Sequence, residues 1–309
     1  MTETTKTIFE KYQVRKTKKQ KTDFINYIKT IITQAGYEFN IEKGLFGARN
    51  IIIGNPDKAK VIYTAHYDTC AVLPFPNFIT PKNFIIYFFY QMTLILAISI
   101  ILFALMIILY LLNVPYVPQI LDIILWFFIA FLLFGPANKH TANDNTSGVT
   151  VILDTINAMP PDLCENVAFI LFDLEEAGLW GSLSFRLRHN KMLKNKLVLN
   201  FDCVSDGNNI LIAVKRKAKC YIPIIKEAFK SNNEFTVEVS SKGIFYPSDQ
   251  ALFHYGVAVA ALKRTKLLNI LYMNRIHTKH DTVYREENIE FLVKGAIKLA
   301  YIKQMLLFL

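Results

Sequence analysis

Cysteine is scarce and unpaired in this sequence. Only four of its 309 residues are cysteine, at positions 70, 164, 203 and 220, and no two form a CxxC pair. Disulfide-stapled domains carry denser cysteines, and structural zinc sites built from thiolates use closely spaced pairs. The pattern therefore excludes both classes, and we expect free, buried thiols in a reducing compartment.

The N-terminal segment lacks the apolar core of a secretory signal. Residues 1–16 read MTETTKTIFEKYQVRK and contain no apolar run. A signal peptide needs such a run, of about 7–15 residues. We therefore expect that this segment does not export the chain.

Charge is nearly absent from one long stretch of the sequence. Asp122 is the only charged residue between Lys82 and Lys139. Residues 84–112 form an uncharged segment of 29 residues, and residues 119–135 form a second apolar segment. A helix of about 20 apolar residues crosses the hydrocarbon core of a bilayer, whereas a soluble core helix usually turns one polar face to water.

This apolar stretch predicts a transmembrane helical hairpin that contacts the lipid bilayer through residues 83–135. A buried core hairpin is the alternative, and a tilted or re-entrant second helix stays open. Residues 1–82 and 136–309 are then predicted to form a single domain. Lysine flanks the hairpin on both sides and is absent from its turn, so the positive-inside tendency places the domain in the cytoplasm.

A basic run at residues 11–21, KYQVRKTKKQK, supplies part of the net charge of +10. Nucleic-acid binding is one interpretation of such a run, but no RNP, zinc-finger or helix-turn-helix pattern accompanies it. We interpret it instead as a solvated helix face or as a basic patch beside anionic lipid, and predict no nucleic-acid partner.

Outside the apolar stretch, short hydrophobic strands alternate with helices. Residues 6–35 are predicted to form one helix, residues 49–54 and 59–66 two strands, and residues 286–309 a closing helix. Continuous apolar strands that alternate with helices are typical of a sheet covered on both faces. The predicted fold class is therefore α/β, with a mostly parallel mixed sheet interrupted by the two-helix hairpin.

Side chains able to bind metal follow the predicted strands, where open α/β sheets place their sites. Five segments supply them: His66 with Asp68; Asp144; Asp173 with Glu175 and Glu176; Asp202; and His277 with His280 and Asp281. Zinc binds imidazole nitrogen and carboxylate oxygen. A two-zinc hydrolase also needs a bridging carboxylate and a further carboxylate that takes the proton of the attacking water.

Six motifs occur along the sequence in the order HYDT, NDNTSGV, LEEAGLWGS, NFDCVSDG, SDQALFHYGVAV and IHTKHDT. In this order they resemble the M28 family of zinc metallopeptidases, the aminopeptidase group that also includes glutaminyl cyclases. The likeness covers roughly residues 45–80 and 138–309. Each motif alone is weak, but six in sequence are specific.

The resemblance implies a zinc-exopeptidase-like fold, peptide substrates and two zinc ions, with a single zinc as the alternative that a glutaminyl cyclase would use. It implies that His66 and Asp202 ligate one zinc and that Glu176 and His277 ligate the other. Asp144 would bridge the two metals. These five residues are the expected metal ligands.

The resemblance also implies roles for residues that do not bind metal. Glu175 would be the general base, and Asp68 would accept a hydrogen bond from the second nitrogen of His66. Asp281 would support its loop. Tyr246 could donate a hydrogen bond to the oxyanion. Gln250 departs from the histidine frequent in the family at this place, which leaves substrate preference open.

Several nearby polar residues have simpler interpretations. His280 competes with His277 as a ligand, but the HTxxDT pattern favours the first histidine. Asp173 is interpreted as structural, and Asp206 and His254 as surface or loop residues.

The expected function is that of a membrane-anchored zinc aminopeptidase, and a carboxypeptidase or dipeptidase specificity stays open. A glutaminyl cyclase shares the ligand pattern and is the first alternative. A membrane scaffold without catalysis is the second, although the complete ligand set disfavours it.

The apolar stretch lies between His66 and Asp144, which are 78 positions apart. The family's gap at this place is short, so the resemblance implies that the hairpin is an insertion. We expect the hairpin to hold the mouth of the site near the bilayer and to favour apolar or membrane-derived peptides.

Overall fold

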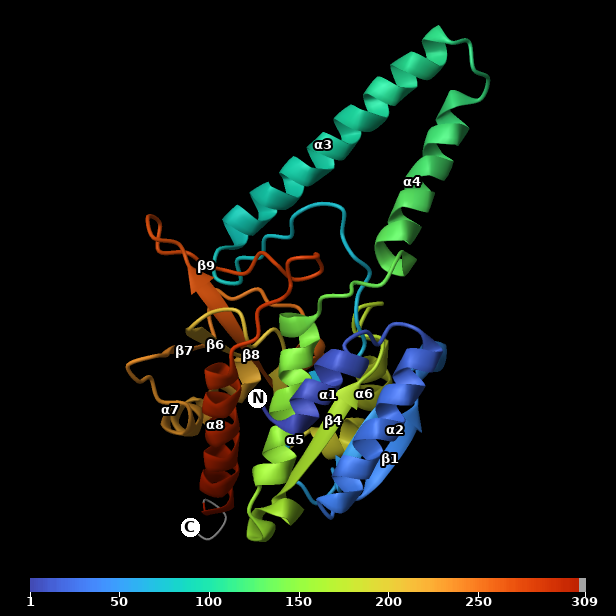
Figure 1. Ribbon diagram of the computed structural model, residues 1–309. Helices are drawn as coiled ribbons and strands as arrows, with labels where there is room; N and C mark the ends of the chain where they lie inside the picture. The colour runs from blue at the N-terminus through green and yellow to red at the C-terminus, as the bar shows by residue number, and fades with distance from the viewer. Residues whose placement is uncertain (306–309) are drawn as a thin grey trace.

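A nine-stranded sheet forms the centre of the structure, a computed structural model that describes residues 1–305 (Figure 1). The strand order is β1-β2-β4-β3-β5-β8-β6-β7, and β9 pairs with β8. The strands are β1 (Phe39–Lys43), β2 (Arg49–Gly54), β3 (Val61–His66), β4 (Val167–Phe172), β5 (Leu197–Phe201), β6 (Asn209–Val214), β7 (Thr236–Ser240), β8 (Tyr255–Arg264) and β9 (Leu271–Tyr272).

The four central strands, β4, β3, β5 and β8, are parallel. Antiparallel pairing occurs towards the edges, where β2 joins β4 and β6 joins β8. Every residue of β3, β4 and β5 is buried, because helices cover both faces of the sheet. The predicted α/β class with a mixed, mostly parallel sheet is therefore confirmed.

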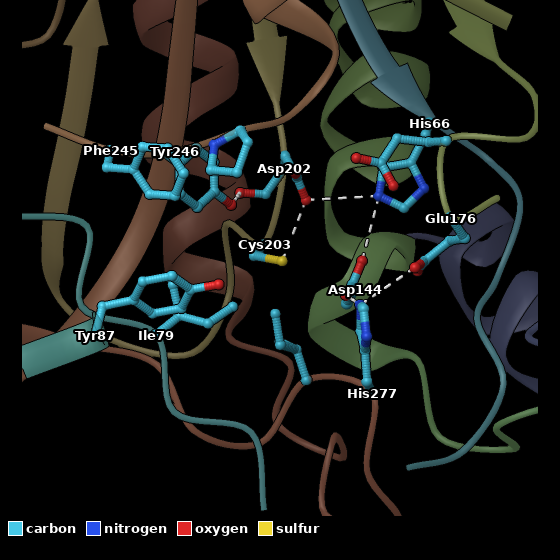
Figure 2. Close-up of a pocket in the computed structure, with 13 residues that line it drawn as sticks. His66, Ile79, Tyr87, Asp144, Glu176, Asp202, Cys203, Phe245, Tyr246 and His277 are labelled. Carbon is cyan, nitrogen blue, oxygen red and sulfur yellow. Dashed lines mark hydrogen bonds and ion pairs between the residues drawn. The ribbon is translucent and has the colours of Figure 1, made fainter. Parts of the chain in front are cut away.

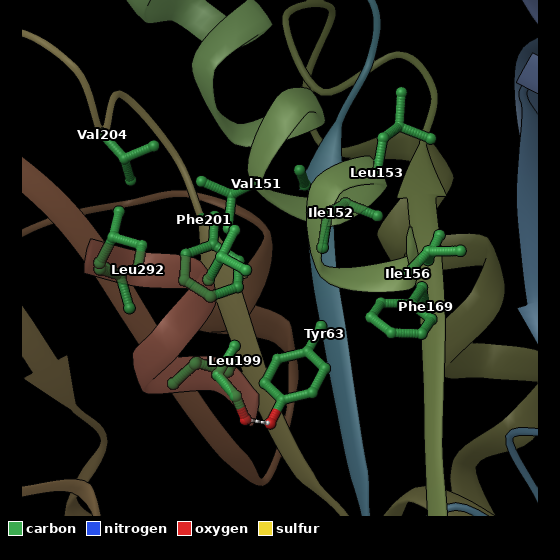
Figure 3. Packing of buried hydrophobic residues seen from close by; sticks show 14 of the residues in the cluster. Tyr63, Val151, Ile152, Leu153, Ile156, Phe169, Leu199, Phe201, Val204 and Leu292 are labelled. Carbon is green, nitrogen blue, oxygen red and sulfur yellow. Dashed lines mark hydrogen bonds between the residues drawn. The ribbon is translucent and has the colours of Figure 1, made fainter. Parts of the chain in front are cut away.

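Helices pack on the two faces of the sheet through separate apolar clusters. One face carries α1 (Glu3–Lys11), α2 (Lys18–Gln34), α5 (Gly148–Ala158), α7 (Ile222–Ala228) and α8 (Glu286–Met305), and the other carries α6 (Trp180–Leu193). In the larger cluster, Ile156 of α5 lies against Phe169 of β4 (Figure 3). Tyr63 of β3 donates a hydrogen bond to the carbonyl of Ala296 on α8 (2.6 Å).

The prediction of a single N-terminal helix over residues 6–35 is wrong, because the two helices α1 and α2 occupy this segment. Thr17 caps the second helix through a reciprocal capping box with Gln20, which favours a helix start at this point. The linker carries Arg15, which is fully buried and donates to the carbonyl of Tyr67. The basic run is thus not simply a solvated face.

The four cysteines are all free, but they are not all buried as expected. Cys70 and Cys203 are buried, Cys164 is half-buried, and Cys220 is exposed.

Two long apolar helices, α3 (Phe84–Leu111) and α4 (Val117–Phe134), form a hairpin that projects from the α/β layers (Figure 1). They occur where the sequence predicts helices. No residue of α3 is buried, and Val117 is the only buried residue of α4. By length and composition, both helices are able to cross a membrane.

Two chain segments connect the hairpin to the sheet, and we call them the outgoing arm (residues 67–83) and the return arm (residues 135–141). They run side by side, because Ala71 pairs with Ala137 and Val72 donates its N–H to the carbonyl of Pro136 (2.9 Å). The outgoing arm begins directly after β3. The hairpin is therefore attached at the edge of the sheet where the parallel strands end.

Candidate active site

Polar side chains from five chain segments converge at the carboxyl ends of the parallel strands (Figure 2). Strands that run in parallel end at one edge of a sheet, so residues far apart in sequence meet there. The residues are His66 at the end of β3, Asp144 before α5, Glu175 and Glu176 after β4, Asp202 after β5, and His277 after β9.

Asp144 lies between the two histidines and turns one carboxylate oxygen towards each. Its Oδ1 is 3.2 Å from Nε2 of His66, and its Oδ2 is 2.9 Å from Nε2 of His277. Asp202 Oδ1 lies 3.5 Å from Nε2 of His66, while Glu176 Oε2 lies 3.2 Å from Nε2 of His277. The result is two adjacent groups of nitrogen and oxygen donors that share one carboxylate.

These donors fit a metal ion in chemistry and in spacing. The donor atoms of His66, Asp144 and Asp202 lie within 4.8 Å of one another, and all three residues are buried. Glu176 and His277 form a similar group, which Cys70 approaches from the outgoing arm. Imidazole and carboxylate are common zinc ligands. Oε1 of Glu176 is buried and has no hydrogen-bond partner among the described residues. This oxygen is therefore a further atom able to coordinate a cation.

The crowding of carboxylates shifts the pKa values of the site. Burial raises the pKa of Glu175 well above its usual range, and burial and the charge of Asp144 raise that of Glu176 to about 8. Burial opposes the charged form of His277, but Glu176 and Asp144 outweigh it and raise the pKa of this histidine to about 10. The carboxylates therefore stabilise positive charge at the position of the imidazoles.

Asp68 holds the turn that carries the two glutamates. Its carboxylate accepts hydrogen bonds from the backbone N–H groups of Glu175 (3.1 Å) and Glu176 (3.3 Å). Nδ1 of His66 lies 3.2 Å from the carbonyl oxygen of Asp68 and 3.6 Å from its carboxylate. Asp68 thus contacts the histidine mainly through its backbone and contacts the glutamate turn through its side chain.

Asp281 performs a similar task for Asp144. Its two carboxylate oxygens accept the N–H groups of Asn143 (2.8 Å) and Asp144 (2.9 Å). Burial and the charge of Asp144 raise the pKa of Asp281 to about 7. The side chain therefore anchors the backbone of the shared carboxylate.

The remaining candidates lie at different distances from the centre. Tyr246 lines the pocket, and its hydroxyl donates to the carbonyl of Asp202 (3.1 Å). His280 is exposed, whereas His277 is in the pocket. Asp173 pairs with Lys21 and does not line the pocket, as a structural residue would.

Asp206 lies in the loop after β5, as one of the two expected positions, but it is not at the surface. It is buried and pairs with Lys263 (3.0 Å) and Arg275 (3.3 Å). The two cations compensate the cost of burying this carboxylate. His254 is exposed as expected.

Sequence reasoning missed Asp249 as a buried charge near the site. This residue is fully buried, and neither carboxylate oxygen has a hydrogen-bond partner in the described part of the chain. Burial raises its pKa to about 7. Its place after Ser248 in the SDQ motif was visible, but an aspartate in a short loop gives no sign of its burial.

The nitrogen and oxygen atoms of the five candidate ligands form one side of a cavity of about 130 Å³.

Residues 126–299 match the sequence pattern of peptidase family M28, a match that covers more than half of the chain. The chain belongs to peptidase family M28. Members of this family typically bind zinc, and the buried cluster of histidine and aspartate could hold such a metal.

Solved structures similar to this M28 chain share its fold at low sequence identity. The Legionella pneumophila LapA aminopeptidase is 14% identical with a TM-score of 0.58, covering 97% of this chain and 70% of LapA. The Porphyromonas gingivalis glutaminyl cyclase is 13% identical with a TM-score of 0.55, covering 97% of this chain and 98% of the cyclase. The Bacteroides thetaiotaomicron glutaminyl cyclase bound to N-acetylhistamine is 13% identical with a TM-score of 0.56, covering 96% and 97%. No curated protein matches the chain in sequence.

Proposed function

We propose that this M28 protein is a membrane-anchored zinc peptidase that removes N-terminal residues from peptides. One observation carries the proposal: Asp144 faces both histidines, and each histidine has a second carboxylate beside it. A two-metal hydrolase needs this division into two donor groups with a shared carboxylate.

His66 and Asp202 would hold one zinc, Glu176 and His277 the other, and Asp144 both. When bound, zinc polarises the carbonyl of the peptide bond and makes an attacking water more acidic. Asp281 holds the backbone of the bridging residue through its N–H group, so the shared carboxylate keeps its position between the histidines.

Glu175 is the proposed general base. It lines the pocket, and Asp68 fixes its backbone through the N–H group (3.1 Å). Burial raises the pKa of its carboxyl group, which suits a residue that first accepts a proton and then releases it. Glu175 would take the proton of the attacking water and deliver it to the leaving amine. Tyr246 would donate to the oxyanion after turning from the carbonyl of Asp202.

Glutaminyl cyclisation is the second candidate. Its support is the coverage of the two cyclase structures, each matched over nearly its whole length. A scaffold without catalysis is the weakest candidate, because the set of proposed zinc ligands and the glutamate base is complete.

The membrane part of the proposal rests on the exposure of α3 and α4 and on their composition. Lys82 and Lys139 flank the hairpin, and the positive-inside tendency therefore supports a cytoplasmic position for the catalytic part. Lys16 also donates to the carbonyl of Leu133 at the end of α4 (2.9 Å). Protease added to sealed, intact cells should leave the catalytic part undigested, and digestion there would contradict the orientation.

Two parallel assays test the reaction. The purified full chain is incubated with aminoacyl amides and, separately, with a peptide that begins with glutamine. We expect zinc-dependent release of amino acids from the first. Cyclisation without any hydrolysis would replace the peptidase proposal with the cyclase, and a protein that binds no zinc and performs neither reaction would favour the scaffold.

A further inference from the structure

The cavity beside the donors has an apolar wall, and part of this wall comes from the hairpin. Tyr87, the fourth residue of α3, and Ile79 on the outgoing arm line the cavity, together with Phe245 and Ile276. Figure 2 shows Tyr87 and Ile79 across the cavity from His66. The hairpin therefore reaches the site itself.

Contacts with a neighbouring loop hold Tyr87 in this wall. Its ring packs against the ring of Phe245, with the centroids 5.9 Å apart, and Phe84 packs against the same ring at 5.4 Å. The N–H of Phe245 donates to the carbonyl of Pro81 (2.8 Å), at the end of the outgoing arm. The start of α3 and the loop of Phe245 thus form one packed unit.

The two arms also contact the loop that carries His277. Leu73 donates its N–H to the carbonyl of His277 (2.8 Å), and Ile79 and Met273 exchange two backbone hydrogen bonds (2.9 and 3.0 Å). On the return arm, the side chain of Asn138 donates to the carbonyl that follows His277 (3.0 Å). The position of α3 is therefore linked by hydrogen bonds to one of the proposed zinc ligands.

We propose that α3 contributes directly to the substrate-binding pocket. Tyr87 of α3 and Phe245 of the neighbouring loop form a subsite that binds an apolar side chain at the substrate's N-terminus. Aromatic side chains offer a large, rigid apolar surface to such a group. The polar donors lie on the opposite side, where the peptide bond would react. This proposal rests on the proposed peptidase function and deepens it, because it makes the hairpin a determinant of specificity.

The test compares Tyr87→Ala and Tyr87→Phe in the full chain, purified in detergent. Substrates are leucine, phenylalanine and alanine amides. Loss of apolar contact in a pocket changes discrimination by about 10–200-fold, so Tyr87→Ala should lower kcat/KM for the leucine and phenylalanine substrates by roughly 10-fold. The alanine substrate should change little, and Tyr87→Phe should restore the preference.

Phe89→Ala is the matched control. Phe89 is an aromatic residue two positions further along α3, is 64% exposed and does not line the cavity. It should leave all three rates unchanged. Equal effects of Tyr87→Ala on every substrate, or no effect, would overturn the subsite. So would a loss of zinc from this variant, because Tyr87 would then act through the metal ligands.

A binding measurement separates this inference from the proposed function. In a Glu175→Gln background, calorimetry with leucine- and alanine-initiated dipeptides should show tighter binding of the leucine peptide, and Tyr87→Ala should remove that difference. If the wild-type chain hydrolyses nothing but this binding preference depends on Tyr87, the peptidase proposal fails and the subsite stands. Equal binding of both dipeptides would overturn the subsite even in an active peptidase.

Discussion

In the candidate active site, His66 and Asp144 expose 1% and 3% of their surface, whereas in the hairpin Trp126 and Phe127 expose 70% and 75%. The two regions thus depart from the usual distribution of polarity in opposite directions. Buried charge is costly unless it is paired or binds a metal, and a large exposed apolar surface indicates an interaction. Under the proposed function, a cation would stabilise the first region and a lipid bilayer would cover the second.

The outgoing and return arms connect the hairpin to the pocket, so these two regions lie close together although their polarities are opposite. Leu73 and Asn138 connect the arms to the loop of His277, and Tyr87 brings one aromatic ring of α3 into the pocket. The comparison therefore raises a question that experiments can answer: whether each region can be changed without changing the other.

Removing the hairpin should give the largest effect. If residues 83–135 are replaced by a short polar loop, we expect the protein to move from the membrane fraction to the soluble fraction, because no long apolar helix remains exposed. Sedimentation after alkaline extraction measures this. A wild-type chain that is itself released by alkaline extraction would contradict the membrane assignment. Retained preference for leucine substrates in the shortened enzyme would show that the hairpin is an anchor only.

Glu175→Gln should have the next largest effect and should be confined to the pocket. General acid–base catalysis contributes about 10²–10⁴-fold, so kcat should fall by about that factor, while bound zinc stays at the wild-type level. Glu290→Gln, on an exposed position of α8, is the control and should keep full activity. Unchanged turnover in Glu175→Gln would show that another group is the base.

His277→Ala sharpens the contrast, because it should act on metal content before it acts on catalysis. Its imidazole lies 2.9 Å from Asp144 and 3.2 Å from Glu176, so the variant should hold less zinc. His280→Ala is the matched control, since that histidine is exposed three residues further on. Equal zinc content in His277→Ala and the wild type would remove this residue from the proposed ligands.

Removing the metal should lower the thermal stability of the protein. This effect should be smaller than those of the substitutions above, but still measurable. A ligand at 100 times its Kd stabilises the folded state by about 2.7 kcal/mol, so a chelator should lower Tm and added zinc should restore it. The Glu175→Gln variant should respond like the wild type. An unchanged Tm on chelation, with zinc shown to leave, would contradict a stabilising role of the metal.

The order of polar and apolar segments predicts the fold class and which residues meet in the candidate site. Apolar strands predict a sheet, and the motif order places His66, Asp144 and Asp202 at strand or helix ends; the structure brings them together. The break at Arg15 was not predicted, because a basic linker between two helices has the same composition as a solvated helix face. The structure resolves this ambiguity through the long-range hydrogen bond from Arg15 to Tyr67.

The apolar wall was also beyond prediction from the sequence. Tyr87 stands among many apolar residues of α3, and no local signal separates it from Phe88 or Phe89. Only the packing of α3 against Phe245 directs Tyr87 to the cavity. Residue types at strand ends thus predict the candidate metal ligands, whereas the proposed subsite depends on contacts between segments that are distant in sequence.

Asp154 on α5 gives the smallest predicted effect and a test of what buried charge costs away from the site. Burial raises the pKa of its carboxyl group to about 6, although a hydrogen bond from Thr2 opposes the shift. The unfolded value is about 3.9. The folded state therefore favours the protonated form, and the stability that this group contributes is lost as pH rises from about 4 to 6.

Asp154→Asn should consequently raise stability at pH 7.5, by roughly 1 kcal/mol after allowance for solvent screening. The gain should shrink as pH falls towards 4, where the wild-type carboxyl group is already neutral. Thermal melts of both proteins across this range measure the effect, and Asp162→Asn, at an exposed position, should show none. A variant that is less stable than wild type at pH 7.5 would mean that Asp154 is stabilised as an anion. Its burial would then resemble that of Asp206, whose lysine and arginine partners compensate the charge.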